Sequence, residues 1–96
     1  MKLKKAIKII SEIRDLKDNW NGYGAKPISK GVINRALQLV VLMKPLPDMI
    51  CPTANNSIQF EWENKLLYLE IEIFSDKIEL FNTCTKNESL CIGGDL

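Results

Sequence analysis

The sequence predicts an α+β domain in which two N-terminal helices pack on one face of an antiparallel, three-stranded β-meander. Three observations support this fold class. Apolar residues recur at helical spacing as far as about residue 43, they alternate with polar residues from Ser57 onward, and a proline-rich connector separates the two patterns. We expect the 96 residues to form a single domain with one modest hydrophobic core.

Two helices are predicted, over residues 2–18 and 30–43. In the first, apolar residues at every third or fourth position form one stripe, and charged residues occupy much of the remaining surface. The second begins after Ser29, a favourable N-cap residue, and must end before Pro45 disfavours helical geometry at Lys44. Its last turns, "LQLVVLM", are apolar almost all round, so the end of helix 30–43 is a candidate homodimer surface.

The second half of the chain is predicted to form strands over residues 57–63, 66–75 and 78–84. A turn at Asn64 and Lys65 would place Trp62 opposite Leu67 and align the apolar faces of the first two strands. The connector "KPLPDMICPTANN" is predicted to contain no regular element. The tail, residues 85–96, could add a fourth strand around Leu90 to Ile92 or could lie outside the sheet.

Composition argues against several classes of function. The longest apolar run is far shorter than the roughly 20 residues that span a bilayer, so we expect a cytoplasmic protein with no membrane partner. The chain has no histidine and three cysteines without metal-binding spacing, so we predict no metal, no cofactor and no nucleophile–base pair. Residues 1–30 carry eight basic and three acidic side chains, but no aromatic residues are interleaved with the lysines of the first helix, which disfavours nucleic acid as a partner.

The face of the predicted sheet that points away from the helices is the principal candidate site. It combines carboxylates with aromatic rings, and the whole of residues 56–96 carries eight acidic and three basic side chains. A flat sheet offers no catalytic cleft, so we expect this face to bind a protein partner, with the aromatic rings as apolar anchors. The predicted site residues are Glu61, Tyr68, Glu70, Glu72, Phe74, Glu79 and Phe81.

The segment "NWNGYGAK" is the second candidate site. Its aromatic residues could stack on a base or a sugar, with polar neighbours beside them, and the residues concerned are Asn19, Trp20, Asn21, Tyr23 and Lys26. Its glycine spacing matches neither a P-loop nor a dinucleotide fingerprint. We favour the structural interpretation, in which Trp20 fills the core and two glycines permit the chain to reverse.

The blocks "NWNGYGAKPIS", "IQFEW" and "LEIEI" resemble a family of small, uncharacterised bacterial proteins. Members share a W-[DN]-G-Y-G-A-x-P-x-S block and a downstream E-W followed by an alternating strand, and the resemblance spans roughly residues 13–80. It implies a bacterial domain carried by mobile elements or phages, and no established activity. We therefore expect a non-enzymatic protein–protein interaction domain, such as an inhibitor or accessory factor. The alternative is a small-ligand or nucleotide-binding domain that uses the Trp20–Lys26 loop.

Overall fold

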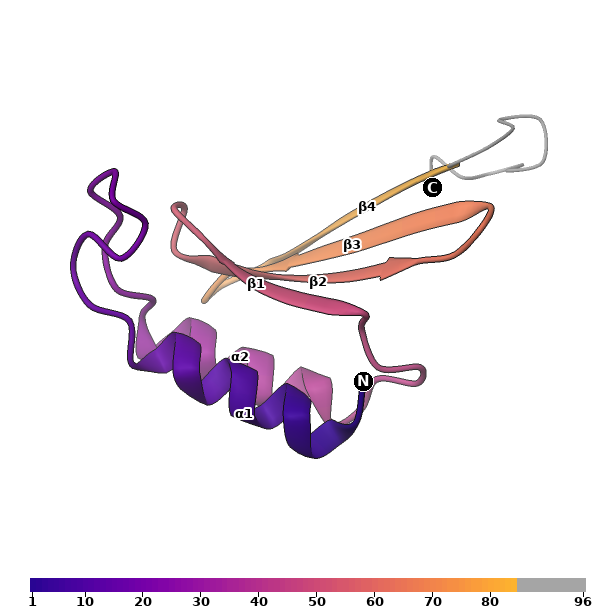
Figure 1. The fold of residues 1–96 in the computed structure, drawn as a ribbon, viewed down its shortest axis with the longest axis horizontal. Helices are drawn as coiled ribbons and strands as arrows, with labels where there is room; N and C mark the ends of the chain where they lie inside the picture. The colour runs from indigo at the N-terminus through magenta and orange to yellow at the C-terminus, as the bar shows by residue number, and fades with distance from the viewer. Residues whose placement is uncertain (85–96) are drawn as a thin grey trace.

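The computed structural model describes residues 1–84 and confirms the α+β prediction. Two helices, α1 (Leu3–Arg14) and α2 (Lys30–Val40), precede an antiparallel sheet with the strand order β1-β2-β3-β4. The strands are β1 (Met49–Thr53), β2 (Ser57–Glu63), β3 (Leu67–Ile73) and β4 (Ile78–Cys84). Both helices lie side by side beneath one face of the sheet, and no helix of residues 1–84 covers the other face (Figure 1). No helix in this part of the chain is long and apolar enough to cross a membrane.

Both helices end earlier than the predicted boundaries at residues 18 and 43. Helix α1 stops at Arg14, where the N–H of Asp15 turns back to the carbonyl of Glu12, three residues earlier. After α2, Leu42 and Met43 donate to carbonyls three residues back, so the chain continues as a tighter turn before Pro45. The helical spacing therefore predicted the correct faces, whereas the last turn of each predicted helix adopts other geometry.

The N-terminus of α2 is capped from a distant part of the chain. Ser29 occupies the N-cap position, but its hydroxyl makes no capping hydrogen bond. Instead, Asn56 in the β1–β2 turn accepts a hydrogen bond from the Ser29 N–H at 2.8 Å, and its amide nitrogen lies 3.3 Å from the Ser29 hydroxyl. Asn56 has a φ of 58°, a conformation that asparagine tolerates better than most residues. This turn thus ties the sheet to the helix layer.

The sheet has four strands, and the additional strand is β1, which lies within the connector predicted to be irregular. Strand β1 has only five residues and includes Pro52, so it lacks the alternating pattern that marks the other strands. Pro52 pairs with Ile58 at the outer edge of the sheet. An edge strand accommodates proline because the missing N–H faces away from the neighbouring strand. The alternative fourth strand around Leu90 to Ile92 lies outside the described residues.

The predicted register of β2 and β3 is wrong by two residues. Trp62 pairs with Leu69 instead of Leu67, because the turn residues are Lys65 and Leu66. The side-chain oxygen of Asn64 accepts hydrogen bonds from the N–H groups of Leu66 and Leu67 at 2.8 Å and holds the turn at that position. A shift of two residues leaves every side chain on the same face. The predicted composition of the two faces is consequently correct.

The hydrophobic core lies between the helices and the first three strands. Helix α1 packs on β1, and α2 packs on β2 and β3. The largest fully buried side chains include Phe60, Ile10 and Ile58. Strand β4 lies beyond this contact area, so Ile78 and Leu80 remain 42% and 57% exposed although they point to the same side of the sheet as the core.

Candidate functional site

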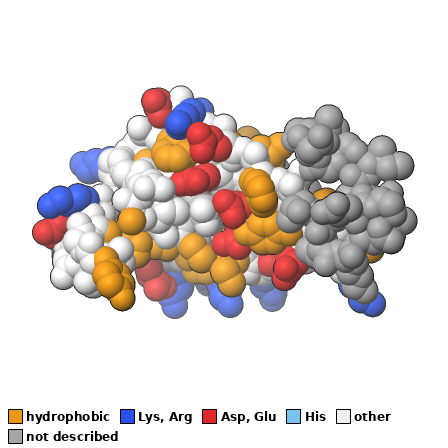
Figure 2. All heavy atoms as spheres, turned by 90° about the horizontal axis from the view of Figure 1, so that it is seen from above, with side chains coloured by type: hydrophobic (Ala, Val, Ile, Leu, Met, Phe, Trp, Pro, Cys, Tyr) orange, Lys and Arg blue, Asp and Glu red, His pale blue; other side chains and the backbone are white. Residues whose placement is uncertain are grey.

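The outward face of the sheet, on the side away from the helices, carries the predicted acidic and aromatic residues. We call this surface the acidic face, and its residues are Glu61, Tyr68, Glu70, Glu72, Phe74, Glu79 and Phe81. Figure 2 shows that acidic side chains cross it as an oblique band with hydrophobic side chains alongside. No lysine or arginine occurs within the sequences of β2, β3 and β4. The fold thus gathers the predicted residues on one continuous surface.

Two carboxylates face each other at the centre of the acidic face. Glu61 and Glu70 are direct cross-strand partners, an arrangement that is destabilising for like charges. The hydroxyl oxygen of Tyr68 lies 2.6 Å from Glu61 Oε1 and 2.8 Å from Glu70 Oε1. Its single proton can be donated to only one of these carboxylates at a time. Tyr68 therefore holds the two groups together without neutralising their charge.

The surroundings of Tyr68 affect both its ionisation and its packing. The hydrogen bond to Glu61 raises the pKa of Tyr68 well above its ordinary value, and burial and Glu70 add to the effect. Ionised tyrosine would place a third negative charge between two carboxylates, which accounts for the direction of the shift. The ring of Phe81 contacts the ring of Tyr68 edge to face, with 6.4 Å between the ring centres. The aromatic pair fixes the position of the hydroxyl.

A third carboxylate, Glu72, is held by a short chain of hydroxyl groups. The hydroxyl of the fully buried Ser57 donates to the Glu72 carboxylate at 2.5 Å. The Thr53 hydroxyl oxygen lies 2.5 Å from the same Ser57 oxygen. Glu72 also pairs across the strands with Glu79. These contacts continue the acidic band from β3 to the edge strand.

Lys77 marks the end of the acidic band at the β3–β4 turn. Its ammonium group lies 3.1 Å from Glu79 and 4.8 Å from the centre of the Phe74 ring. The Lys77 and Glu79 side chains are both more than half exposed, so this ion pair can be exchanged for a contact with another cation. Basic groups are therefore compatible with this surface, and Lys77 occupies only one end of it.

The Cys51 thiol of β1 lies near enough to Glu61 for the two groups to interact electrostatically. Burial and, to a smaller extent, the Glu61 carboxylate raise the pKa of the half-buried Cys51 thiol, which lowers its fraction of reactive thiolate. Within residues 1–84, no group of three histidine, cysteine, aspartate or glutamate side chains is arranged to hold a metal ion. The arrangement is suited to electrostatic recognition.

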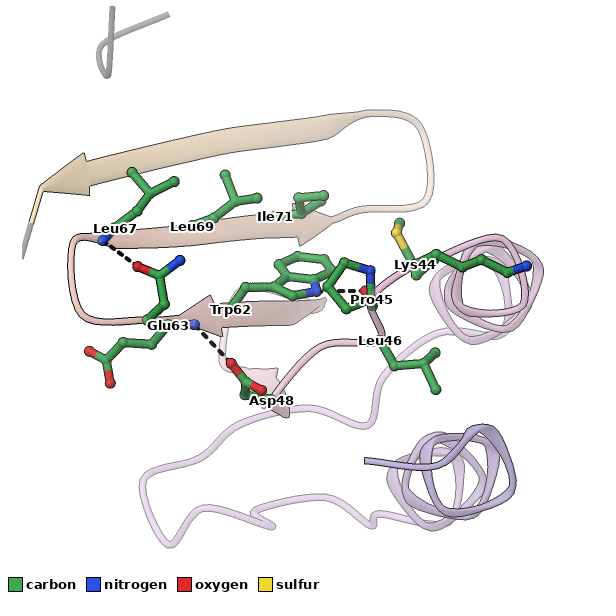
Figure 3. Close-up of a pocket in the computed structure, with 11 residues that line it drawn as sticks. Lys44, Pro45, Leu46, Asp48, Trp62, Glu63, Leu67, Leu69 and Ile71 are labelled. Carbon is green, nitrogen blue, oxygen red and sulfur yellow. Dashed lines mark hydrogen bonds between the residues drawn. The ribbon is translucent and has the colours of Figure 1, made fainter. Parts of the chain in front are cut away.

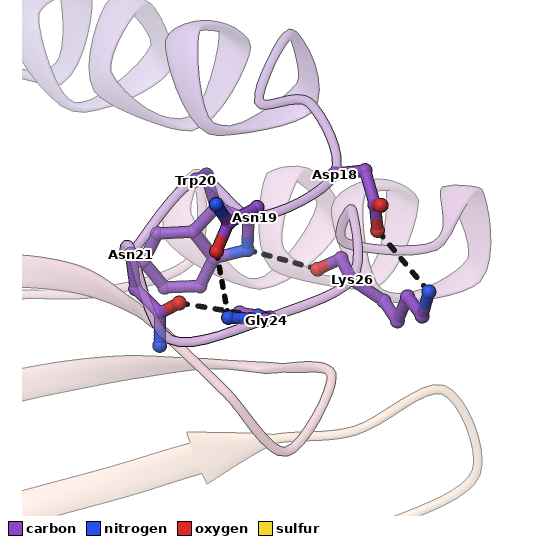
Figure 4. A network of polar contacts seen from close by, with 7 residues as sticks. Asp18, Asn19, Trp20, Asn21, Gly24 and Lys26 are labelled. Carbon is purple, nitrogen blue, oxygen red and sulfur yellow. Dashed lines mark hydrogen bonds and ion pairs between the residues drawn. The ribbon is translucent and has the colours of Figure 1, made fainter.

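The second candidate, the "NWNGYGAK" loop, uses most of its polar groups internally (Figure 4). The side-chain oxygen of Asn19 accepts a hydrogen bond from the Gly24 N–H at 2.7 Å, and that of Asn21 accepts from two further backbone N–H groups. The indole N–H of Trp20 donates to the carbonyl of Lys26 at 2.8 Å. The Lys26 ammonium lies 3.3 Å from the Asp18 carboxylate. These contacts favour the structural interpretation of the loop.

Tyr23 is the aromatic residue of this loop that projects into solvent. Its side chain is 93% exposed, whereas Trp20 packs against the core. Gly22 and Gly24, on either side of Tyr23, have φ values of 79° and 84°, which other residues rarely adopt. The loop therefore does not bring Trp20 and Tyr23 together as a stacking pair.

One feature was not predicted from the sequence, an apolar pocket of about 530 Å³ beneath the β2–β3 hairpin (Figure 3). The connector between α2 and β1 forms one wall, and the indole of Trp62 donates to the carbonyl of Pro45 at 2.9 Å across it. Asp48 accepts a hydrogen bond from the Glu63 N–H at 2.9 Å and fixes the start of β1. The pocket depends on how the connector folds back, so no local sequence signal identifies it.

Comparisons with family models, with curated proteins and with solved structures find no match to this chain. The resemblance through the W-[DN]-G-Y-G-A-x-P-x-S block therefore depends on that motif and the strand pattern alone. The fold and the site define the class of protein, a small α+β domain with an acidic, aromatic sheet face.

Proposed function

We propose that this protein is a non-enzymatic protein–protein interaction domain that binds a basic surface of its partner through the acidic face. The facing pair of Glu61 and Glu70, held 2.6 and 2.8 Å from one tyrosine hydroxyl, is the observation that carries this proposal. A lysine or arginine of a partner would relieve the repulsion between these carboxylates. The gain would be largest where the contact excludes water.

The aromatic residues supply the apolar part of the proposed interface. Phe81 is 56% exposed and lies at the edge of the face, next to Tyr68. Aromatic side chains that become buried in an interface often contribute much of its binding energy. A basic partner with an apolar patch beside its cationic group would match both features.

The biological setting of this proposal comes from the resemblance described above. A small bacterial domain carried by a mobile element or phage would act as an inhibitor or accessory factor by covering a basic region of its target. The acidic band and the absence of basic residues in β2, β3 and β4 support a basic target. They equally disfavour nucleic acid as the partner of this face.

Self-association through the end of α2 remains a separate prediction. Leu42, just beyond the helix, is 75% exposed and Val41 is also exposed, so an apolar surface exists there. Only part of the predicted apolar end is exposed, because Val40 is fully buried and Leu39 and Met43 pack against the core. The rival proposal, a small-ligand site at the loop, is supported by the exposure of Tyr23.

The proposal is tested by affinity capture of partners from a lysate of the native host, with and without nuclease, read by mass spectrometry. The test variant is Glu70→Lys with Glu72→Lys, and the control with the same charge change is Glu12→Lys with Asp15→Lys on exposed positions of α1 and its C-cap. We expect one stoichiometric, nuclease-resistant protein, lost with the test variant and retained with the control.

Two outcomes would contradict the proposal, namely a captured protein that both variants retain equally and a captured partner that nuclease removes. Because Glu72 accepts a hydrogen bond from buried Ser57, thermal unfolding of the test variant must first show that it folds. Glu70→Lys with Glu79→Lys is the second variant, since Glu79 is exposed and makes no such bond. Tyr23→Ala tests the rival loop site and should leave capture unchanged.

A further inference from the structure

Strand β4 forms one edge of the sheet within residues 1–84, and its backbone hydrogen-bonding groups alternate in direction. The N–H of Phe74 donates to the carbonyl of Lys77 at 2.9 Å, which makes these residues a hydrogen-bonded pair at the β3–β4 turn. In an antiparallel pair such positions alternate with non-bonded ones. The N–H and carbonyl groups of Ile78, Leu80 and Asn82 therefore point away from β3, toward the free edge.

Within residues 1–84, this edge lacks most of the features that normally prevent strands from pairing between molecules. Proline, inward-pointing charges and covering elements are the usual protections. The opposite edge strand, β1, contains Pro52 and packs on α1. Strand β4 contains no proline, and Ile78, Leu80 and Phe81 are each more than 40% exposed. Among the residues that the structure describes, the two edges of the sheet are thus differently protected, and β4 is the uncovered one.

We propose that β4 pairs antiparallel with β4 of a second copy of this chain, about a two-fold axis at Leu80. In this register the outward-pointing groups of Ile78, Leu80 and Asn82 complete hydrogen-bonded pairs with the same groups of the second copy. Leu80 meets its own counterpart on the helix side of the sheet, and Glu79 lies opposite Phe81 of the partner copy. Two-fold pairing of one surface with itself is the commonest form of protein self-association.

Charge selects this register over the one with its two-fold axis at Glu79. If the two-fold axis lay at Glu79 instead of Leu80, Glu79 would lie directly opposite Glu79 of the second copy, which is destabilising for like charges. The register at Leu80 avoids that contact and matches apolar side chains at the axis. Both helix layers then lie on the same side, and the two acidic faces form one larger surface on the other side.

This inference does not depend on the proposed function, because it concerns the edge of the sheet and not the partner of the acidic face.

The test is the concentration dependence of molar mass for the full chain, measured by analytical ultracentrifugation up to about 100 μM, where a micromolar dimer would be well populated. Leu80→Lys places a charge on the open edge and should weaken the dimer by at least about tenfold. Asn82→Pro removes an N–H that β3 does not use and should have the same effect. Leu42→Lys, an equally drastic change at an exposed leucine outside β4, should leave the dimer intact.

Disulfide trapping tests the register. In a background with Cys51, Cys84 and Cys91 replaced by serine, Leu80→Cys should form a covalent dimer under mild oxidation, because residues facing each other at the axis lie within disulfide range. Glu79→Cys is the matched control and should cross-link far less. A monomer at every concentration, a dimer that persists in both Leu80→Lys and Asn82→Pro, or loss of the dimer in Leu42→Lys instead would overturn the proposal.

Discussion

Replacing Tyr68 by phenylalanine removes the hydroxyl that bridges Glu61 and Glu70 and leaves the ring in place. The edge-to-face contact with Phe81 can persist, so the change isolates the two hydrogen-bond contacts at 2.6 and 2.8 Å. The carboxylates then face each other across the strands with no shared donor. We expect the variant to fold and to be less stable than the wild type.

The size of the loss follows from the two contacts. A hydrogen bond to a charged group contributes about 1.5–3 kcal/mol when well buried. Tyr68 and both carboxylates are half-buried, so solvent screening reduces this to about 1 kcal/mol. For a domain of this size such a loss lowers the Tm by about 4–8 °C.

The assay is urea unfolding at pH 7 of the wild type, Tyr68→Phe, and Tyr68→Phe combined with Glu61→Gln. The double variant has one carboxylate instead of two, so we expect it to recover part of the lost stability. Added salt should also narrow the gap between Tyr68→Phe and the wild type, because it screens the carboxylate pair. Equal stability of Tyr68→Phe and wild type, or a loss that neither Glu61→Gln nor salt reduces, would refute the reasoning.

The pH dependence gives an independent check on the same contacts. The pKa of Tyr68 is higher in the folded protein than the value of about 10 in an unfolded chain. The unfolded state therefore releases this proton first as pH rises. The contribution of Tyr68 to the free energy of unfolding is fully present below a pH of about 10. It is lost as the pH rises through the pKa that Tyr68 has in the folded protein. The stability difference between wild type and Tyr68→Phe should therefore shrink above pH of about 10.

Further predictions concern the turn that caps α2, the core, the loop and the thiol. Asn56→Ala should destabilise the domain by about 1–2 kcal/mol in chemical unfolding, and Asn56→Gly by less, because glycine adopts the φ of 58° without strain. Phe60→Ala should cost about 3–5 kcal/mol, since this ring is fully buried. Gly24→Ala should cost about 1–2 kcal/mol from its φ of 84° alone, because no atom lies within 4 Å of the added methyl group. Cys51 should alkylate slowly at pH 8, and Glu61→Gln should accelerate it by removing the smaller of the two causes that raise its pKa, as measured by peptide mapping.

The parts of the fold that could be predicted are those controlled by periodicity. The apolar stripe of the first helix and the alternation in β2 and β3 predicted which side chains face the core, and the structure agrees for Ile10, Ile13 and Phe60. The acidic face follows from the same alternation. A register error of two residues did not change it, because side chains repeat their orientation every second residue.

The remaining features depend on contacts between distant parts of the chain. Strand β1 forms because Ile50 pairs with Phe60, and its own five residues show no strand pattern. Asn56 caps a helix 27 residues earlier in the chain, so its role cannot be read from neighbouring residues. The bridging role of Tyr68 likewise requires Glu61 from another strand. In each case the local sequence permits the structure, and tertiary contacts select it.

The central claim is that the acidic face binds a basic partner. The most direct test is an NMR titration of the isotope-labelled chain with the purified captured protein, at two salt concentrations. We predict that the backbone signals of residues around Glu61, Glu70 and Glu79 shift, and that higher salt weakens the effect. Shifts confined to residues 19–26 would contradict the claim and identify the loop around Tyr23 as the binding site. Binding that is insensitive to salt would also contradict the claim.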